Sequence, residues 1–256
     1  MKRRWRINQR TTQSQENLEL GFLVTMWSGG RVQFDDNWNS CHRMLNMQSD
    51  AKLKSITVRA RACKRTLDLL FASSLILLLS PLLVLAGLLV FLGDGWPIIY
   101  RRRVVGKDGQ FYAYKFRSMR KDADAILAAN PALRDEFERN FKLKCDPRVT
   151  KVGRVLRKLS VDELPQLFNV VCGQMSLVGP RMISPAELDR YGPNKEVLLT
   201  LKPGLTGYWQ VNGRQEVDYG ERIRMDLHYI YNWSLAMDLK ILFKTPYAVL
   251  KREGAY

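Results

Sequence analysis

The stretch LDLLFASSLILLLSPLLVLAGLLVFLGDG, residues 67–95, decides how this chain is built. Residues 69–92 carry no charge. A helix rises about 1.5 Å per residue, so this run would reach about 36 Å, more than the roughly 30 Å of a hydrocarbon core. The simplest interpretation is a single transmembrane helix.

Two features favour a helix that enters and leaves the membrane by the same face. Ser80 and Pro81 fall at the middle of the run, and proline removes a backbone donor and so kinks or breaks a helix. Both flanks are basic, and positive charge marks the cytoplasmic end of a membrane segment. The flanking residues are Arg59, Arg61, Lys64 and Arg65, then Arg101, Arg102, Arg103 and Lys107. Because many single-span helices contain proline, the spanning and re-entrant alternatives both stay open.

The chain divides into three parts around this segment. Residues 1–55 are polar and basic without sustained periodicity, which predicts a disordered N-terminal arm, with Met44 and Met47 as alternative starts. Residues 56–98 form the membrane segment and its flanks. Residues 99–256 form a small cytosolic domain.

The cytosolic part is predicted to be α+β and mostly helical, with one short β-hairpin. In residues 97–119, side chains alternate with a period of two on either side of the glycine-containing turn GKDG, which indicates two antiparallel strands. Helices are expected at 120–142 (divided by Pro131), 151–159, 162–175 and, as a pair capped by Ser234 and interrupted by Pro246, 219–252. Residues 176–188 and 201–214 are predicted to be loops.

Composition narrows the chemistry. The formal charge of +16 predicts a polyanionic partner: nucleic acid, an anionic bilayer or a phosphorylated small molecule. The four cysteines show no C-x-x-C spacing, which indicates reduced thiols without a disulfide framework or zinc site. The two histidines have no metal-ligand neighbours, so carboxylates, cations and a hard metal ion must carry any chemistry.

Residues 158–166, KLSVDELPQ, place Asp162 beside Glu163. One interpretation is helix capping, either by a Ser160–Glu163 capping box or by Asp162 as N-cap with Pro165 in the first turn. The other interpretation is catalytic. Cations surround the pair in sequence: Arg148, Lys151, Arg154, Arg157 and Lys158 before it, and Arg181 after it.

A carboxylate among phosphate-binding cations, next to a membrane, favours phosphoryl transfer. Such catalysis depends on positioning and charge neutralisation, with Mg²⁺ commonly shared between carboxylate and phosphate oxygens. An aspartate can also act as nucleophile and form an acyl-phosphate. The basic residues have an alternative role on a solvated face or against anionic lipid.

Several ordered blocks resemble the bacterial polyprenyl-phosphate sugar-1-phosphate transferases, monotopic enzymes that start exopolysaccharide and capsule repeat units. The resemblance covers residues 60–256 and rests on SPLLVLAGLLV, YKFRSM (114–119), residues 146–181, PGLTGYWQVNGR (203–214) and DLHYIYNWSLAMDLKIL (226–242). It implies a catalytic domain at 99–256, a re-entrant helix broken at Ser80–Pro81, and a location at the cytoplasmic face of the bacterial inner membrane.

The resemblance also implies the reaction and its residues. Asp162 matches the family's nucleophile, which attacks the β-phosphate of a UDP-sugar, releases UMP and passes the sugar phosphate to undecaprenyl phosphate. Glu163 matches its partner in a dyad that binds Mg²⁺. Arg181 matches a phosphate-binding arginine, and Lys115 and Arg117 match basic residues near the active site.

Two positions depart from the family pattern: Gln174 replaces an acidic residue, and Met182 replaces proline, which predicts a looser loop after Arg181. The C-terminal blocks most resemble galactose- and glucose-transferring members and favour galactose. Two alternatives remain: a non-enzymatic membrane scaffold of polysaccharide assembly, and an enzyme whose dyad only binds metal while the lipid phosphate attacks directly.

Overall fold

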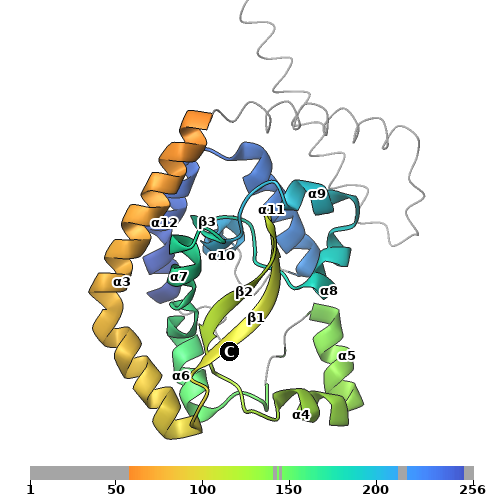
Figure 1. The fold of residues 1–256 in the computed structure, drawn as a ribbon. Coiled ribbons are helices and arrows are strands. Elements are labelled where there is room, and N and C mark those ends of the chain that lie inside the picture. The colour runs from red at the N-terminus through yellow and green to blue at the C-terminus, as the bar shows by residue number, and fades with distance from the viewer. Residues whose placement is uncertain (1–57, 141–142, 144–145, 213–217, 251–256) are drawn as a thin grey trace, which may run out of the picture. The chain divides into compact units, whose positions relative to one another are not determined.

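The computed structural model describes residues 58–140, 143, 146–212 and 218–250 (Figure 1). The predicted N-terminal arm, residues 1–55, lies outside these residues. The described part of the chain is mostly helical and contains two sheets of two strands each. The mostly helical α+β prediction is confirmed.

The apolar segment forms one helix, α3 (Val58–Asp94), which runs through Pro81 and is bent (Figure 1). Of the kink or break predicted at Ser80 and Pro81, the structure shows a bend within one continuous helix. Pro81 cannot donate to the Leu77 carbonyl one turn earlier. The Ser80 hydroxyl donates to that carbonyl instead, at 2.8 Å. Because a side-chain bond replaces the lost backbone bond, the helix bends without breaking.

The predicted hairpin is confirmed. Strands β1 (Ile99–Gly106) and β2 (Gly109–Phe116) pair antiparallel, and their register closes at Gly106 opposite Gly109. Gly109 has φ of 110°, which favours glycine. Lys115 lies near the end of β2, and Arg117 follows directly after the strand.

Three helices after the hairpin also follow the sequence pattern. Helices α4 (Ala123–Ala129) and α5 (Pro131–Asn140) divide at Pro131, where the missing N–H is no loss because the first helical N–H groups have no intrahelical partner. The basic helix α6 (Lys151–Lys158) is capped by Thr150, whose hydroxyl accepts from Gly153 N at 2.9 Å.

Two segments predicted to be loops pair as strands, so this prediction is wrong. Strand β3 (Ser176–Val178) lies parallel to β4 (Gly204–Thr206). The connection contains α8 (Pro185–Leu188), η2 (Asp189–Asn194) and α9 (Lys195–Leu198), and α10 (Tyr208–Asn212) follows β4. Strands of three residues are too short to show alternation, so only their distant partner defines them.

The last two helices are α11 (Tyr219–Asn232) and α12 (Leu235–Leu250). The predicted cap is confirmed, since Met237 N donates to the Ser234 hydroxyl at 3.2 Å. The predicted interruption at Pro246 is wrong, because α12 continues to Leu250. Packing of α12 against α10, β3 and β4 outweighs the loss of one backbone hydrogen bond.

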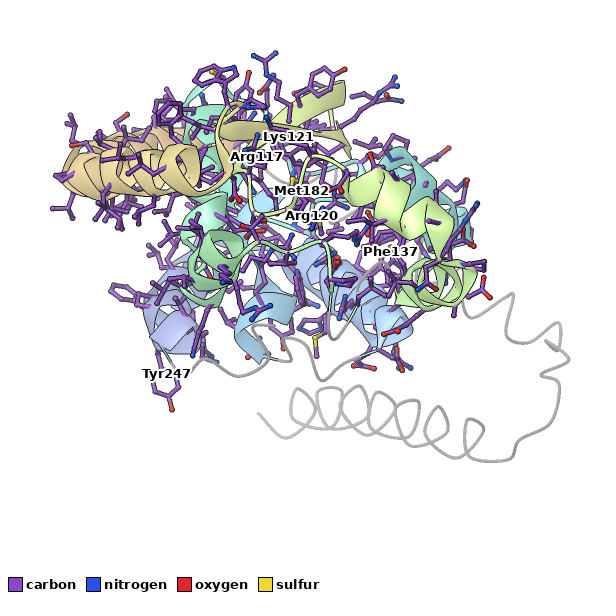
Figure 2. All side chains as sticks on the ribbon, turned by 90° about the horizontal axis from the view of Figure 1, so that it is seen from below. Arg117, Arg120, Lys121, Phe137, Met182 and Tyr247 are labelled. Atoms are coloured by element: carbon purple, nitrogen blue, oxygen red, sulfur yellow. The ribbon has the colours of Figure 1, made fainter. Side chains whose placement is uncertain are left out.

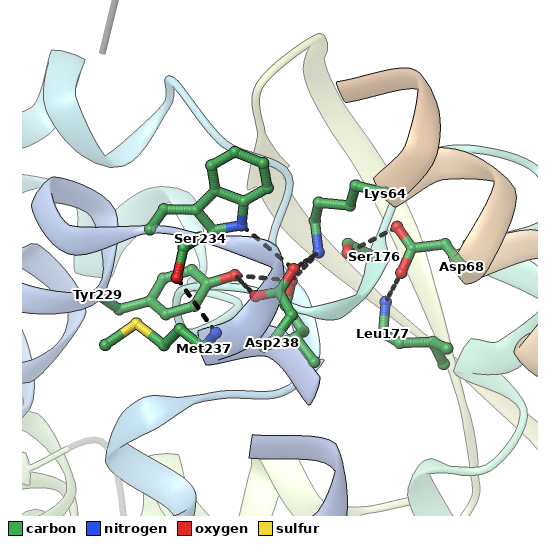
Figure 3. A network of polar contacts seen from close by, with 10 residues as sticks. Lys64, Asp68, Ser176, Leu177, Tyr229, Ser234, Met237 and Asp238 are labelled. Atoms are coloured by element: carbon green, nitrogen blue, oxygen red, sulfur yellow. Dashed lines mark hydrogen bonds and ion pairs between the residues drawn. The ribbon is translucent and has the colours of Figure 1, made fainter. Parts of the chain in front are cut away.

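Polar contacts fix the first half of α3 to the domain (Figure 3). Lys64 Nζ lies 2.6 Å from Asp238 Oδ2 on α12 and donates to the Val178 carbonyl on β3 at 3.0 Å. Asp68 Oδ2 accepts from the Ser176 hydroxyl at 2.8 Å. These contacts hold β3, and therefore the start of the loop that leads to Arg181.

The second half of α3 returns to the same domain. Ala86 and Val90 are buried with Phe116 and Leu156 in a small cluster. Between the two contact regions the helix exposes Leu77, Leu78, Val84 and Leu85. Figure 2 shows the side chains of α3 projecting outward around the helix. Among the described residues, α3 is the one helix long and apolar enough to cross a membrane.

Candidate active site

The two central carboxylates lie between α6 and α7 (Gln166–Val171), in the short helix η1 (Val161–Glu163). Ser160 adopts a left-handed conformation, with φ of 56°, and turns the chain here. Its hydroxyl caps no helix, and Pro165 rather than Asp162 holds the N-cap position of α7. Both capping interpretations are therefore wrong.

Asp162 is buried, with 7% of its surface exposed. Burial, followed by the neighbouring charge of Glu163, raises the pKa of Asp162 to about 6, while Lys115 and Arg157 oppose the rise. The carboxylate forms no ion pair with the described residues. A buried carboxylate that is ionised at neutral pH, and whose oxygens are not engaged by a cation, is available as a nucleophile.

Glu163 has a different environment. Its Oε1 forms an ion pair with Lys115 Nζ. Burial would raise the pKa of Glu163, but Lys115, Arg181 and Arg102 lower it below its usual value. The two adjacent carboxylates are therefore unequal, since Glu163 is held by a cation while Asp162 is left for chemistry.

The structure brings three of the predicted cations together around this pair: Lys115 from β2, Arg157 from α6 and Arg181 from the loop after β3. Arg157 is held by its Nε, which donates to the Ser118 hydroxyl at 2.9 Å. The Arg181 guanidinium carbon lies 4.9 Å from the centroid of the Trp209 ring. The three cations can oppose several phosphate charges at once.

The other two predicted phosphate ligands have protein partners. Arg117 Nη2 donates to the Gly95 carbonyl at 2.7 Å, beyond the C-terminus of α3, although its Nε and Nη1 lack partners. Arg148 forms a two-pronged contact with Asp146, both bonds measuring 2.8 Å. Its guanidinium also lies over the Phe137 ring. A phosphate role for Arg117 and Arg148 stays a prediction.

Sequence reasoning missed the group that positions Arg181. Asp226 on α11 is fully buried, and it accepts from the Arg181 backbone N–H at 3.0 Å and from the Tyr191 hydroxyl at 2.9 Å. Burial raises the pKa of Asp226 to about 7. The signal was present, because Asp226 shares helical spacing with buried Tyr229 and Ile230.

The two departures from the family pattern both contact the domain, Gln174 from an exposed position and Met182 from a buried one. Gln174 Oε1 accepts from Asn169 Nδ2 at 2.7 Å. Met182 is buried, and the next residue pairs with Val105, whose N–H donates to the Ile183 carbonyl at 3.0 Å. The loop after Arg181 is therefore tied to β1 at this point.

Asp162 and Glu163 suit a magnesium ion that is bound jointly by the protein and by a phosphorylated substrate. Mg²⁺ is commonly bound by one or two carboxylates, with phosphate oxygens and water completing its shell. Asp162 and Glu163 supply two adjacent carboxylates. No cluster of three or more His, Cys, Asp or Glu side chains suited to a metal occurs in the part of the chain that the structure describes.

Comparisons with known proteins show the family to which the chain is similar. A family model described as bacterial sugar transferase matches residues 59–252. The UDP-galactose-lipid carrier transferase of Erwinia amylovora is 49% identical over 77% of this chain and 42% of its own length. The exopolysaccharide production protein ExoY of Sinorhizobium fredii is 48% identical over 75% of this chain and 88% of its own.

A third relative is the undecaprenyl-phosphate galactose phosphotransferase of Salmonella typhimurium, 46% identical over 83% of this chain and 45% of its own length. The chain therefore spans less than half the length of the Salmonella and Erwinia proteins. The ExoY protein of Sinorhizobium fredii, in contrast, is matched over most of its own length.

Proposed function

Because the chain belongs to the bacterial sugar transferase family, we propose that it transfers a hexose 1-phosphate from a UDP-sugar to undecaprenyl phosphate and releases UMP. The observation that carries the proposal is the buried Asp162 carboxylate near Lys115 and Arg157. Beside it lies Glu163, whose pKa Arg181 helps to lower. Relatives named for galactose and for glucose transfer support a hexose donor, with galactose favoured. The product would begin an exopolysaccharide or capsule repeat unit.

The proposed chemistry has two steps. An Asp162 oxygen attacks the β-phosphorus of the donor, the bond from that phosphorus to the bridging oxygen breaks, and UMP departs with the bond's electrons. The sugar phosphate is then held as a mixed anhydride on Asp162. An oxygen of the lipid phosphate attacks the same phosphorus and releases the Asp162 carboxylate.

The surrounding residues support both steps. Lys115 orients Glu163 through their ion pair and adds positive charge beside the transferred phosphate. Arg157 and Arg181 supply fixed charge that needs no reorganisation during the reaction. Mg²⁺ held by Asp162 and Glu163 would neutralise phosphate charge when bound.

The membrane arrangement is part of the proposal. Both halves of α3 contact one domain, while its other face exposes apolar side chains from Leu70 to Leu92. A straight span would carry its two ends to opposite faces of the bilayer. We therefore place α3 as a re-entrant helix in the cytoplasmic leaflet of the inner membrane, at a depth where the site meets a lipid phosphate.

Cysteine labelling in intact cells tests this arrangement. In a background without native cysteines, Val58→Cys and Trp96→Cys lie at exposed positions at the two ends of the helix. Both are expected to resist a membrane-impermeant maleimide and to react after permeabilisation. Reaction of just one of them in intact cells would establish a spanning helix.

The reaction itself is tested on purified protein in detergent or nanodiscs. Several UDP-sugars are offered with undecaprenyl phosphate and Mg²⁺, and UMP release is measured. With donor labelled in the β-phosphate and no lipid acceptor, label is expected to stay on the protein. Release of UMP without trapped label would favour direct attack by the lipid, and no release from any donor would favour the scaffold role.

A further inference from the structure

Two guanidinium groups meet on one aromatic ring beside the proposed active site. The guanidinium carbons of Arg181 and Arg222 lie 4.9 and 5.3 Å from the centroid of the Trp209 ring. Arg222, on α11, is 7% exposed, and Trp209, on α10, is 8% exposed. Like charges repel strongly in so buried a setting, because little water is available to screen them.

Each of these three side chains has one buried hydrogen-bond donor without a partner among the described residues. The Nε atoms of Arg181 and Arg222 and the Nε1 atom of Trp209 are buried without a hydrogen-bond partner. Buried donors normally have partners, and a buried charge normally has a counter-ion. Arg222 forms no ion pair with the residues that the structure describes.

The neighbouring carboxylates are engaged elsewhere. Glu187 Oε2 accepts from Arg102 and from Ser184, both at 2.8 Å, although its Oε1 has no partner. Asp226 accepts from the backbone of Arg181 and from Tyr191. Asp218 caps α11 by accepting from Glu221 N at 2.7 Å. In the part of the chain that the structure describes, no carboxylate forms an ion pair with Arg222, so this cluster can accept a further anion.

The position of Arg181 relates the cluster to the dyad. Arg181 lowers the pKa of Glu163 on one side, and on the other side it contributes to lowering the pKa of Arg222, after burial. Arg181 is thus near Glu163, and it shares the Trp209 ring with Arg222. An anion held by Arg181 and Arg222 would therefore lie next to the phosphate that Asp162 attacks.

We propose that Arg222, together with Trp209 and Arg181, binds the phosphate that departs with the nucleoside. This inference rests on the proposed function. When the bond between the β-phosphorus and the bridging oxygen breaks, that oxygen leaves on UMP with an added negative charge. Arg222 binds this charge as it develops, and the indole N–H donates a further bond. The second step, in which UMP has already left, makes no use of the subsite.

Substitution of Arg222 by glutamine separates the two steps. UMP affinity, measured by calorimetry on the full chain, is expected to fall about tenfold to 100-fold, the usual value of a charged hydrogen bond. The first-step burst of UMP should slow by a similar factor. Transfer from pre-labelled protein to undecaprenyl phosphate should stay within about twofold of wild type, since binding at this subsite is then over.

Arg224→Gln on the same helix is the matched control, because Arg224 is 45% exposed and pairs with Glu221 on the surface. It should change neither step. Arg222→Lys keeps the charge and should bind UMP more tightly than Arg222→Gln. Arg222→Lys also serves as the test if Arg222→Gln does not fold. The proposal would be overturned if Arg222→Lys bound UMP as tightly as wild type but carried out the second step more slowly.

Other outcomes separate this proposal from the proposed function. Unchanged UMP affinity in Arg222→Gln overturns the subsite even if transfer activity is confirmed. Weaker capture of the lipid phosphate with normal UMP binding assigns the cluster to the acceptor and also overturns it. A third outcome is that Arg222→Gln weakens UMP binding but the wild-type protein transfers no sugar phosphate. That result would support the subsite and contradict the proposed transferase reaction.

Discussion

Replacement of Asp162 by asparagine is expected to abolish transfer, with turnover reduced roughly 10⁴-fold or more, as for other enzymes that lose a nucleophile. The amide cannot form the mixed anhydride, so no label from the donor should remain on the protein. UMP release and label trapping measure the two effects independently. Asp122→Asn, at an exposed ion pair with Arg120, is the matched control and should leave both unchanged.

The same substitution is expected to stabilise the fold near neutral pH. The pKa of Asp162 is about 6 in the folded chain against 3.8 for the ordinary side chain. A raised pKa means that ionisation opposes folding, so the wild type loses stability as pH rises from about 4 to 6. This difference corresponds to roughly 3 kcal/mol at pH 7.5.

Denaturation in detergent at two pH values measures this effect. Asp162→Asn should unfold at a higher temperature than wild type at pH 7.5, and the difference should shrink towards pH 4. Wild-type transfer should decline below about pH 6 as Asp162 takes up a proton. An asparagine variant that keeps normal turnover would leave Asp162 without a chemical role, while equal stability at pH 7.5 would contradict its burial as a charge.

Gly204→Ala is expected to disrupt the fold around Arg181. A Cβ atom at position 204 would lie 2.1 Å from Gly179 N and 2.3 Å from Thr206 O. Both contacts are with backbone, which cannot rotate away. Gly204 N also donates to the Pro180 carbonyl at 3.0 Å. Displacement of the backbone at Gly204 would therefore also move Pro180, the residue before Arg181.

The expected cost is about 3 kcal/mol or more, at the upper end of overpacking in a protein interior. Thermal unfolding and recovery of folded protein measure it, and UMP release should fall with them. Gly220→Ala is the matched control, because a Cβ there meets only the Asp218 carboxylate, at 3.3 Å, and alanine suits a helix better than glycine. If Gly204→Ala were as stable as wild type, the backbones at Gly204 and Gly179 could not approach each other as closely as the structure shows.

Much of the fold could be predicted because it is local. The apolar run at 69–92, the GKDG turn and Pro131 each express a preference of nearby backbone, so α3, the β1–β2 hairpin and the α4–α5 division follow from pattern alone. Adjacent carboxylates among cations are also visible in a short window, so the pattern marked Asp162 and Glu163 as candidates, and the family resemblance then implied their roles.

The rest depends on partners that are distant in sequence. The pairing of β3 with β4 joins two motifs that look irregular alone, and packing keeps α12 helical through Pro246. At Ser80 a hydroxyl replaced the missing backbone donor, so the proline bent α3 and did not break it. In each case a hydrogen bond or a packing contact outweighed the local preference of the chain.

The sequence by itself determined the long apolar helix and the hairpin and singled out Asp162 and Glu163 as candidates, because each depends on residues close together in the chain. The tertiary structure alone decided which cations lie near these candidates: it gathers Lys115, Arg157 and Arg181, engages Arg148 with Asp146, and brings Arg222 to Trp209. Charges are alike in a sequence, and only their neighbours in space determine which of them lack a counter-ion and can therefore bind a substrate.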